Sequence, residues 1–322
     1  MLSTEICRRF GIQHPIVQAG MGAFTSAELA AAVSNAGALG TIGAANRSAE
    51  GLGAEIDRVR RLTRLPFAVN HLVSNLDKEA FSVTLKSRVP VISFALGDPG
   101  DLVRQAHDSG ALVMHQVHTV TQAKQAVDRG VNVLIAQGGE AGGFGQYVGT
   151  FVLLPQVVDA VRPVPVLAAG GIADGRGLAA ALLLGAQGVN LGTRFLATAE
   201  APVSEGYKKT ILEAQSEDAV KVEVWNDFMP VPGRDGYGTV PRAIRTWFIE
   251  RWQGQRVDAK KNAEMIRAEL TAAAEQGTFH ELVPFAGQTV GLINEIAPAG
   301  EIVRRIVEEA RQLLDDAPKL AT

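Results

Sequence analysis

The sequence of 322 residues contains a single cysteine, Cys7. One thiol excludes a disulfide within the chain and a metal cage of several thiolates, and it fits a reducing compartment. No segment approaches the roughly 18 consecutive apolar residues of a membrane-spanning helix, and the first residues lack the apolar core of a signal peptide. We therefore expect a cytoplasmic protein.

Neither sign of charge dominates, because the formal net charge is only −3. A chain without a basic surplus gives no reason to expect nucleic acid or an anionic membrane as a partner. The six histidines show no HExxH or comparable ligand spacing, so no metal site is predicted. A small-molecule substrate is the favoured partner, and the sequence leaves open whether the chain forms a homo-oligomer.

Eight short β-like runs alternate with helical patterns along the first two thirds of the chain. Each repeat has room for one strand, one helix and two short loops, which is typical of right-handed βα units and a parallel sheet. Eight units predict a closed (β/α)8 TIM barrel, whereas a doubly wound sheet would show its glycine fingerprint after the first strand. The predicted strands are Ile16–Gln18, Leu39–Ile42, Phe67–Asn70, Val91–Phe94, Leu112–Gln116, Val133–Ala136, Val166–Ala168 and Gly188–Leu191.

The regular alternation stops after the eighth predicted strand. Residues 207–280 contain charged helical stretches and an aromatic segment, and they predict a mainly helical cap inserted after that strand. Residues 1–206 and 281–322 would form the barrel. The amphipathic pattern over 287–314 is expected to supply a helix that closes it.

Four of the predicted strands run into loops rich in glycine. In barrel enzymes the active site lies at the carboxyl ends of the strands, where these loops would meet. Glycine lets the backbone approach a flat or phosphorylated ligand closely and exposes its N–H groups. The loops after the seventh and eighth strands therefore predict a phosphate site made by Gly170, Gly171, Gly192 and Thr193.

Six motifs, in the same order along nearly the whole chain, resemble those of one known family. They are His14–Gly22, Phe67–Asn70, Gln137–Gly143, Leu167–Asp174, Gly188–Phe195 and Ala286–Gln288. The chain thereby resembles the nitronate monooxygenase (2-nitropropane dioxygenase) family of FMN-dependent barrel enzymes, which also includes flavin-containing enoyl-acyl-carrier-protein reductases.

The resemblance implies fourteen residues that contact FMN. Backbone of the first loop would line the isoalloxazine, two amides would reach the ring or the ribityl chain, Gln137 and two glycines would lie beside the cofactor, and the last two loops would hold the phosphate. These residues are Ala19, Gly20, Met21, Gly22, Asn70, Gln116, Gln137, Gly142, Gly143, Ala169, Gly170, Gly171, Gly192 and Thr193.

The chain departs from the family at Phe144, because many members have a histidine there that is taken to be the catalytic base. A phenyl ring cannot accept a proton. The substrate could be an alkyl nitronate that is already an anion and is oxidised with O2, which is the first choice by family. Another histidine could have taken over the role, with His71 the best placed and His118 second. Or the flavin could exchange hydride with an enoyl or acyl thioester, with NAD(P)H as co-substrate and Phe144 as an apolar wall.

An explanation of a different class is a non-redox barrel that isomerises or synthesises a sugar phosphate. It would need an acid–base pair or a Schiff-base lysine at a strand end, and none is evident. Glu140, inside the glycine loop, is expected to bind a loop amide or to pair with Arg194. Asp174 is expected to cap the helix that follows it.

Overall fold

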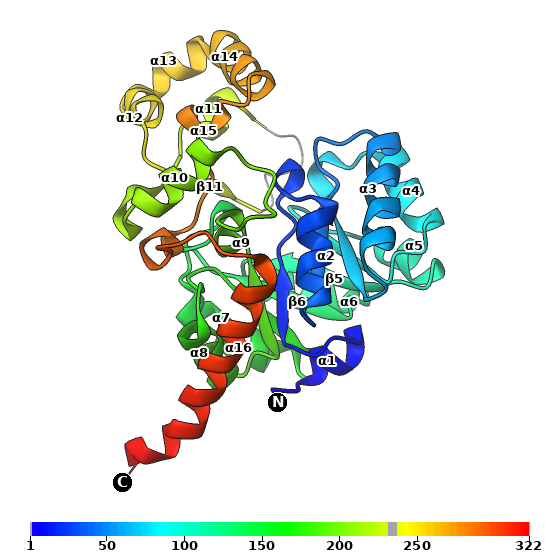
Figure 1. Ribbon diagram of the computed structural model, residues 1–322. Helices are drawn as coiled ribbons and strands as arrows, with labels where there is room; N and C mark the ends of the chain where they lie inside the picture. Colours follow the sequence, from blue (N-terminus) through cyan, green and yellow to red (C-terminus); the bar gives the residue numbers. More distant parts are fainter. Residues whose placement is uncertain (1, 231–236, 322) are drawn as a thin grey trace.

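The computed structural model describes residues 2–230 and 237–321, and Figure 1 shows a barrel with a helical cap over one end. All eight predicted strands are present in one parallel sheet with the order β1-β9-β8-β6-β5-β4-β3-β2. They are β1 (Ile16–Gln18), β2 (Gly40–Gly43), β3 (Phe67–Leu72), β4 (Val91–Ala95), β5 (Leu112–Val117), β6 (Val133–Gln137), β8 (Val166–Ala169) and β9 (Gly188–Leu191).

The sheet closes on itself between its first and last strands. Val17 of β1 forms a parallel bridge with Leu39, and the backbone N–H of Gln18 donates to the carbonyl of Leu39 at 2.9 Å. Closure leaves no free sheet edge in the barrel, and it confirms the predicted (β/α)8 TIM barrel.

Eight helices cover the outside of the barrel: α2 (Ala27–Asn35), α3 (Ala49–Leu62), α4 (Lys78–Lys86), α5 (Leu102–Asp108), α6 (Val120–Asp128), α7 (Thr150–Val161), α8 (Gly175–Leu183) and α16 (Ala299–Asp316). Several begin at side-chain caps. Ser26 Oγ accepts from the N–H of Leu29 at 3.1 Å, and Asp174 Oδ1 accepts from the N–H of Gly177 at 3.2 Å, as predicted. Within the described residues, no helix has both the length and the apolar character that crossing a bilayer requires.

The last helix starts later than the pattern over 287–314 predicts. Residues Gln288–Leu292 form a short 3₁₀ helix, and α16 begins only after Pro298, which occupies its N-cap. Proline is tolerated at a helix start but not inside a helix, so it fixes this boundary. α16 packs against α8 and α2 and completes the outer ring.

The barrel interior changes from apolar to polar along its axis. Its lower part is filled by apolar side chains such as Val17, Ala68 and Met114, and helix α1 (Glu5–Phe10) closes the amino-terminal end. Successive side chains of a strand point to opposite faces. One layer further toward the carboxyl ends, the inward positions therefore include Asn70 and Gln116, which face the open end.

The chain between β9 and α16 includes the cap. Its elements are α9 (Thr193–Leu196), α10 (Glu205–Glu213), β10 (Ala219–Lys221), α11 (Trp225–Phe228), β11 (Val240–Ile244), α12 (Trp247–Gln253), α13 (Arg256–Lys261), α14 (Ala263–Glu275) and α15 (Phe279–Leu282). Buried aromatic and aliphatic side chains, Trp225, Phe228, Phe248 and Ile266 among them, form its core. The division into a barrel of 1–206 and 281–322 and a cap of 207–280 stays a prediction.

A small antiparallel sheet that the sequence did not reveal joins the cap to the barrel. Strand β7 (Gly143–Gly145) lies in the glycine loop after β6, and it pairs with β11, which pairs with β10. Phe144 lies opposite Pro241 in this register. The glycine loop is therefore held by backbone hydrogen bonds to the cap as well as by its own strand.

Candidate active site

A cavity of about 270 Å³ opens at the carboxyl ends of the barrel strands, below the cap. All fourteen residues predicted to contact the cofactor line it, and so does Phe144. Loops more than 170 positions apart in the sequence thus meet around one space. The structure brings these residues together, and their contacts with FMN stay a prediction.

Four amide side chains point into this cavity from the strand ends. Gln116 Nε2 donates to Oε1 of Gln137 at 2.8 Å. Asn70 and Asn190 are only 6 % and 8 % exposed, and their side chains have no hydrogen-bond partner among the described residues. Both side chains line the cavity, so their amide groups are available to hydrogen-bond a polar ligand.

The glycines of the rim leave the backbone itself as the cavity wall. A Cβ on Gly20 would lie 2.2 Å from the Cβ of Asn70. Gly170 has φ +93°, and a Cβ there would lie 3.0 Å from the carbonyl oxygen of Gly138. No larger residue fits either position without displacing its neighbours. The lack of a side chain at these two positions therefore lets the rim loops pack closely on one another.

The predicted phosphate end lies where β9 leads into α9. Thr193 is the first residue of α9, and its Oγ1 accepts the N–H of Gly287 at 2.9 Å. The hydroxyl hydrogen of Thr193 remains to donate to a ligand. A Cβ on Gly192 would make only ordinary contacts, the nearest with Sδ of Met21 at 3.6 Å. Together with Gly170 and Gly171, these groups offer the hydrogen-bond donors that a phosphate needs, and their role in binding the phosphate of FMN stays a prediction.

Glu140 braces the glycine loop. Its carboxylate accepts the N–H of Thr150 at 2.9 and 3.0 Å and the hydroxyl of Thr150 at 2.9 Å. Thr150 begins α7, so the carboxylate occupies a helix start, and the amide that it binds belongs to α7 and not to the loop that the sequence suggested. The alternative pairing is not found, because Arg194 donates to the carbonyls of Ala197 and Glu295, both at 2.7 Å.

Phe144 of β7 and Phe285, which follows α15, form an aromatic wall of the cavity. The ring of Phe144 lies 6.1 Å from Trp225 and 5.9 Å from Phe285, and Phe285 also lines the cavity. Among the described residues that line it, there is no arginine, lysine or histidine, and Glu140 is the one carboxylate. The space beside the predicted flavin is apolar and carries no cationic side chain.

His71 does not line this cavity. It follows the inward-facing Asn70 in β3 and therefore points to the outer face of the barrel, where its ring packs edge-on against Phe81 at 5.2 Å. Its Nε2 lies 2.9 Å from Oγ1 of Thr84. Burial lowers the pKa of His71 to about 4, so the ring is neutral near pH 7.

His118 also lies outside the cavity, fully buried behind the end of β5. Its Nδ1 is 3.4 Å from the carbonyl oxygen of Gln137, and its Nε2 has no partner among the described residues. Burial lowers its pKa to about 4. The structure thus does not bring His71 or His118 to the cofactor loops, and a catalytic role for either stays a prediction.

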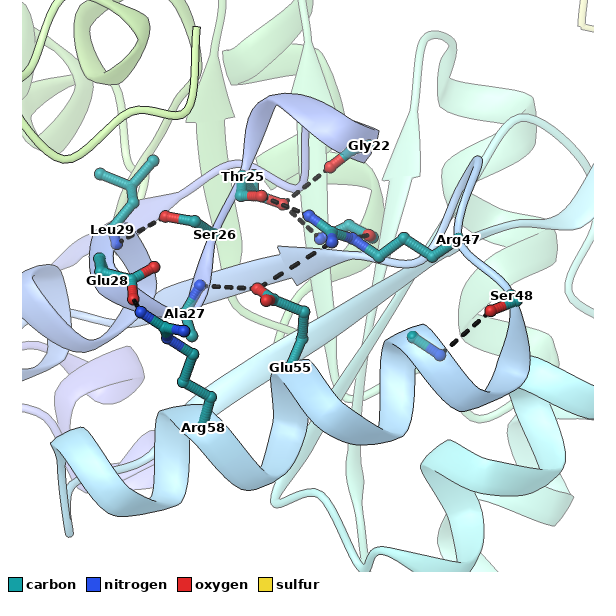
Figure 2. Close-up of polar contacts among 12 residues, drawn as sticks. Gly22, Thr25, Ser26, Ala27, Glu28, Leu29, Arg47, Ser48, Glu55 and Arg58 are labelled. Atoms are coloured by element: carbon teal, nitrogen blue, oxygen red, sulfur yellow. Dashed lines mark hydrogen bonds and ion pairs between the residues drawn. The ribbon is translucent and has the colours of Figure 1, made fainter.

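Arg47 holds the first glycine loop, a role that the sequence did not suggest. Its Nε donates to the carbonyl of Gly43 at 3.0 Å, and its Nη2 donates to the carbonyl of Thr25. Figure 2 shows the guanidinium directed at Thr25 and Glu55. Thr25 in turn donates its hydroxyl to the carbonyl of Gly22 at 2.8 Å. The carboxylate of Glu55 accepts the N–H of Ala27 at 2.8 Å, which ties the start of α2 to α3.

Two relatives match the chain over almost its whole length. It is 33% identical to the (3aS,4S,5R,7aS)-5-hydroxy-7a-methyl-1-oxo-octahydro-1H-indene-4-carboxyl-CoA dehydrogenase of Mycobacterium tuberculosis, with 99% of both chains covered. It is 30% identical to a probable nitronate monooxygenase of Staphylococcus saprophyticus, with 98% of this chain and 99% of the relative covered.

A solved structure agrees with these similarities. FabK from Thermotoga maritima superimposes with a TM-score of 0.91 at 34% identity, covering 99% of this chain and 100% of that one. The profile of the nitronate monooxygenase family matches residues 3–81 and 77–309. This chain therefore belongs to the nitronate monooxygenase family and is an oxidoreductase.

Proposed function

We propose that the protein is an FMN-dependent oxidoreductase that reduces the carbon–carbon double bond of an enoyl thioester, with NAD(P)H as the electron donor. The observation that carries this proposal is the composition of the cavity wall. No cationic side chain of the described residues reaches it, and its one carboxylate, Glu140, is engaged with Thr150. Such a wall favours a neutral, largely apolar substrate.

An anionic substrate fits this wall less well. A nitronate would lie in a buried space without arginine, lysine or histidine and near the carboxylate of Glu140. Burial of an anion without a partner is costly, because the charge loses its hydration. A neutral nitroalkane would avoid that cost, but it needs a base, and Phe144 cannot accept a proton.

The fit to FMN rests on the unpartnered amides and the glycine rim. Asn70, Asn190 and the pair of Gln116 and Gln137 would hydrogen-bond the polar edge of the ring, and Gly170, Gly171, Gly192 and Thr193 would hold the phosphate. When bound, the flavin supplies hydride transfer. Phe144 and Phe285 would hold the acyl group against the ring and exclude water. The proton that completes the reduction would come from solvent, because the described wall has no free acid.

Similarity to the relative from M. tuberculosis and to FabK supports a thioester as the substrate. The relative from M. tuberculosis is named as a dehydrogenase of a carboxyl-CoA compound, and FabK shares the fold at 34% identity. A thioester substrate joined to an apolar group is consistent with the first of these names and with the aromatic wall.

Anaerobic stopped-flow spectroscopy tests the proposal. The purified protein should be yellow, NADH or NADPH should bleach the flavin absorbance, and a trans-2-enoyl thioester should restore it without O2. A flavin that NAD(P)H does not reduce, or that no enoyl thioester reoxidises, would contradict the proposal. A protein that binds no FMN would favour the non-redox barrel instead.

A second candidate is the oxidation of alkyl nitronates with O2. The specific observation in its favour is Phe144, because a preformed nitronate needs no base. The relative from S. saprophyticus carries that activity in its name. In the same instrument, propyl-2-nitronate would bleach the flavin without NAD(P)H, and O2 would restore the absorbance.

A further inference from the structure

A second cavity, of about 300 Å³, adjoins the first at the carboxyl ends of β2 and β3. Ala45, Asn46 and Leu72 line both cavities, so the two share a wall near the mouth of the predicted flavin site. The second cavity is polar, unlike the first, since its wall includes Asn46, Arg47, His71, Asn75 and Asp77. His71, which the flavin cavity leaves unused, lies here.

Hydrogen bonding fixes which nitrogen of His71 carries the proton. Thr84 Oγ1 donates its hydrogen to the carbonyl of Ala80 at 3.1 Å, so toward His71 it can only accept. In the tautomer consistent with that bond, Nε2 of His71, 2.9 Å away, carries the hydrogen. Because burial keeps the ring neutral, Nδ1 is a bare acceptor. Nδ1 has no partner among the described residues and is the ring nitrogen available to a ligand in this cavity.

The two charged side chains of the second cavity are already engaged. Arg47 donates to two carbonyls, and its Nη1 lies 4.0 Å from the carboxylate of Glu55; Figure 2 shows these contacts. Asp77 Oδ1 accepts the N–H groups of Glu79 and Ala80 at 2.9 and 3.0 Å, as the N-cap of α4. The two charges are opposite in sign and both side chains hold local backbone, so the cavity carries no net charge from this pair and suits a neutral ligand.

The side-chain groups of the second cavity that have no hydrogen-bond partner are complementary to an amide. His71 Nδ1 can accept a hydrogen bond, and the side-chain amides of Asn46 and Asn75, which have no partner among the described residues, can donate and accept. A secondary amide offers one N–H and one carbonyl oxygen and is neutral. Its N–H would satisfy His71, and its carbonyl would take a hydrogen bond from an asparagine.

We infer that the second cavity binds an amide of the pantetheine arm that carries the acyl group, with Nδ1 of His71 accepting the amide N–H. This inference rests on the proposed function, because a thioester in the first cavity leads into such an arm. Coenzyme A and an acyl-carrier protein share the arm, so the site would recognise what the two carriers have in common. His71 is a binding residue in this account and takes no part in proton transfer.

Two substitutions of His71 distinguish the contribution of Nδ1 to ligand binding from that of Nε2. In His71→Gln the side-chain amide can replace Nε2 toward Thr84, but the acceptor at the position of Nδ1 is lost. In His71→Asn a polar atom stays near Nδ1, while the bond to Thr84 is lost. The probe is S-butylpantetheine, an unreactive thioether, titrated calorimetrically into the FMN-loaded protein. We expect His71→Gln to raise its Kd by about tenfold or somewhat less, the usual size of one neutral hydrogen bond, and His71→Asn to stay closer to wild type.

The control ligand is 2-(butylthio)ethanol, which ends before the first amide, and its Kd should be the same for both variants. Equal affinity of wild type and His71→Gln for S-butylpantetheine would overturn the inference. So would an equal loss for both ligands, because that would indicate general damage to the site.

A substitution at another residue of the cavity tests the inference even if His71→Gln does not fold. Asn75 is exposed, and Asn75→Trp would fill the cavity from outside. Glu79→Trp is the matched control, since Glu79 is also exposed on this segment but lines neither cavity. Binding of S-butylpantetheine should weaken at least tenfold in Asn75→Trp and be retained in Glu79→Trp. Equal binding by both variants would contradict the inference.

These binding measurements require no turnover. The binding inference and the proposed function can therefore be refuted separately. Turnover of enoyl thioesters with unchanged binding in His71→Gln would overturn the cavity assignment alone. Weakened binding in a protein that no enoyl thioester reoxidises would overturn the function alone. Titrations with S-butyl-CoA and with an S-butylated acyl-carrier protein then identify which carrier supplies the arm. Binding of either one more tightly than S-butylpantetheine supports the second cavity as the site of the arm.

Discussion

Gln116 and Gln137 meet across neighbouring strands of the barrel, with Nε2 of Gln116 donating to Oε1 of Gln137 at 2.8 Å. The side chains belong to β5 and β6, whose parallel pairing places Gln116 beside Ile135. Because Oε1 of Gln137 is used, its NH2 group is left to face the cavity as a donor. The pair therefore offers a ligand fixed hydrogen-bonding groups and not two freely rotating amides.

Removing this contact should weaken FMN binding. In Gln116→Leu, the half-buried Oε1 of Gln137 loses its partner and the amide is no longer held in place for the ligand, at a cost of about 1 kcal/mol for one hydrogen bond. We expect the Kd for FMN, measured by quenching of flavin fluorescence, to rise about tenfold. Gln156→Leu, a substitution at an exposed position of α7, is the control and should bind FMN as wild type does. An unchanged Kd in Gln116→Leu would remove the pair from the cofactor site.

The two glycines of the predicted phosphate site should respond differently to alanine. Gly170 has φ +93°, whereas a Cβ on Gly192 would make only ordinary contacts. The left-handed conformation costs an alanine about 1–2 kcal/mol. We therefore expect Gly170→Ala to lose both thermal stability and FMN, and Gly192→Ala to keep the stability of the apoprotein while binding FMN more weakly. Equal melting temperatures for the two apoproteins would contradict this assignment of strain.

The eight barrel strands could be predicted because each is a short buried run followed by a turn and a helix. The four residues of the predicted phosphate site followed from that, since the carboxyl ends of barrel strands meet at one rim. The other ten lining residues followed from the resemblance to the nitronate monooxygenase family. Asn190 was missed, although alternation in β9 reveals it: Val189 and Leu191 pack outward in the core, so Asn190 faces inward.

Two features could not be predicted from local pattern. The sequence pattern ended the third strand at Asn70, but the strand continues to Leu72, so His71 is a strand residue that points outward. The strand β7 consists of Gly143, Phe144 and Gly145 and has low intrinsic β propensity. It forms because β11, almost 100 residues later, pairs with it, and such pairing leaves no signal in a short window.

Phe144→His tests whether this position faces the substrate. The imidazole would restore an acceptor beside the predicted flavin ring, so the variant should oxidise nitroethane, a neutral nitroalkane, more rapidly than wild type. The gain should increase with pH as the imidazole loses its proton, around the ordinary histidine pKa of about 6.5. Phe144→Leu is the control, because it opens the aromatic wall without adding a base. A similar gain in Phe144→Leu, or none in Phe144→His, would place the side chain away from the reacting carbon.

Lys221 should make stability depend on pH. Its Nζ donates to the carbonyls of Gly145 and Val240 at 3.0 and 3.1 Å, and it thereby joins the small sheet across β7, β10 and β11. Burial, assisted by the charge of Arg242 and opposed by Glu140, lowers the pKa of Lys221 from 10.5 to about 7. The folded protein therefore releases this proton at a lower pH than the unfolded chain does.

Between pH 7 and 10.5 the unfolded state binds more protons at this lysine, so this residue's contribution to the free energy of unfolding should rise with pH. Below pH 7 the lysine is charged in both states and contributes no slope. The slope in between is at most about 1.4 kcal/mol per pH unit. Urea unfolding at pH 6.5, 8 and 9.5 measures it, and Lys221→Met should flatten the rise that wild type shows. Lys209→Met, at a lysine whose side chain is 73% exposed, should keep the wild-type slope. Parallel pH profiles for wild type and Lys221→Met would show that the ammonium is not desolvated beneath the glycine loop.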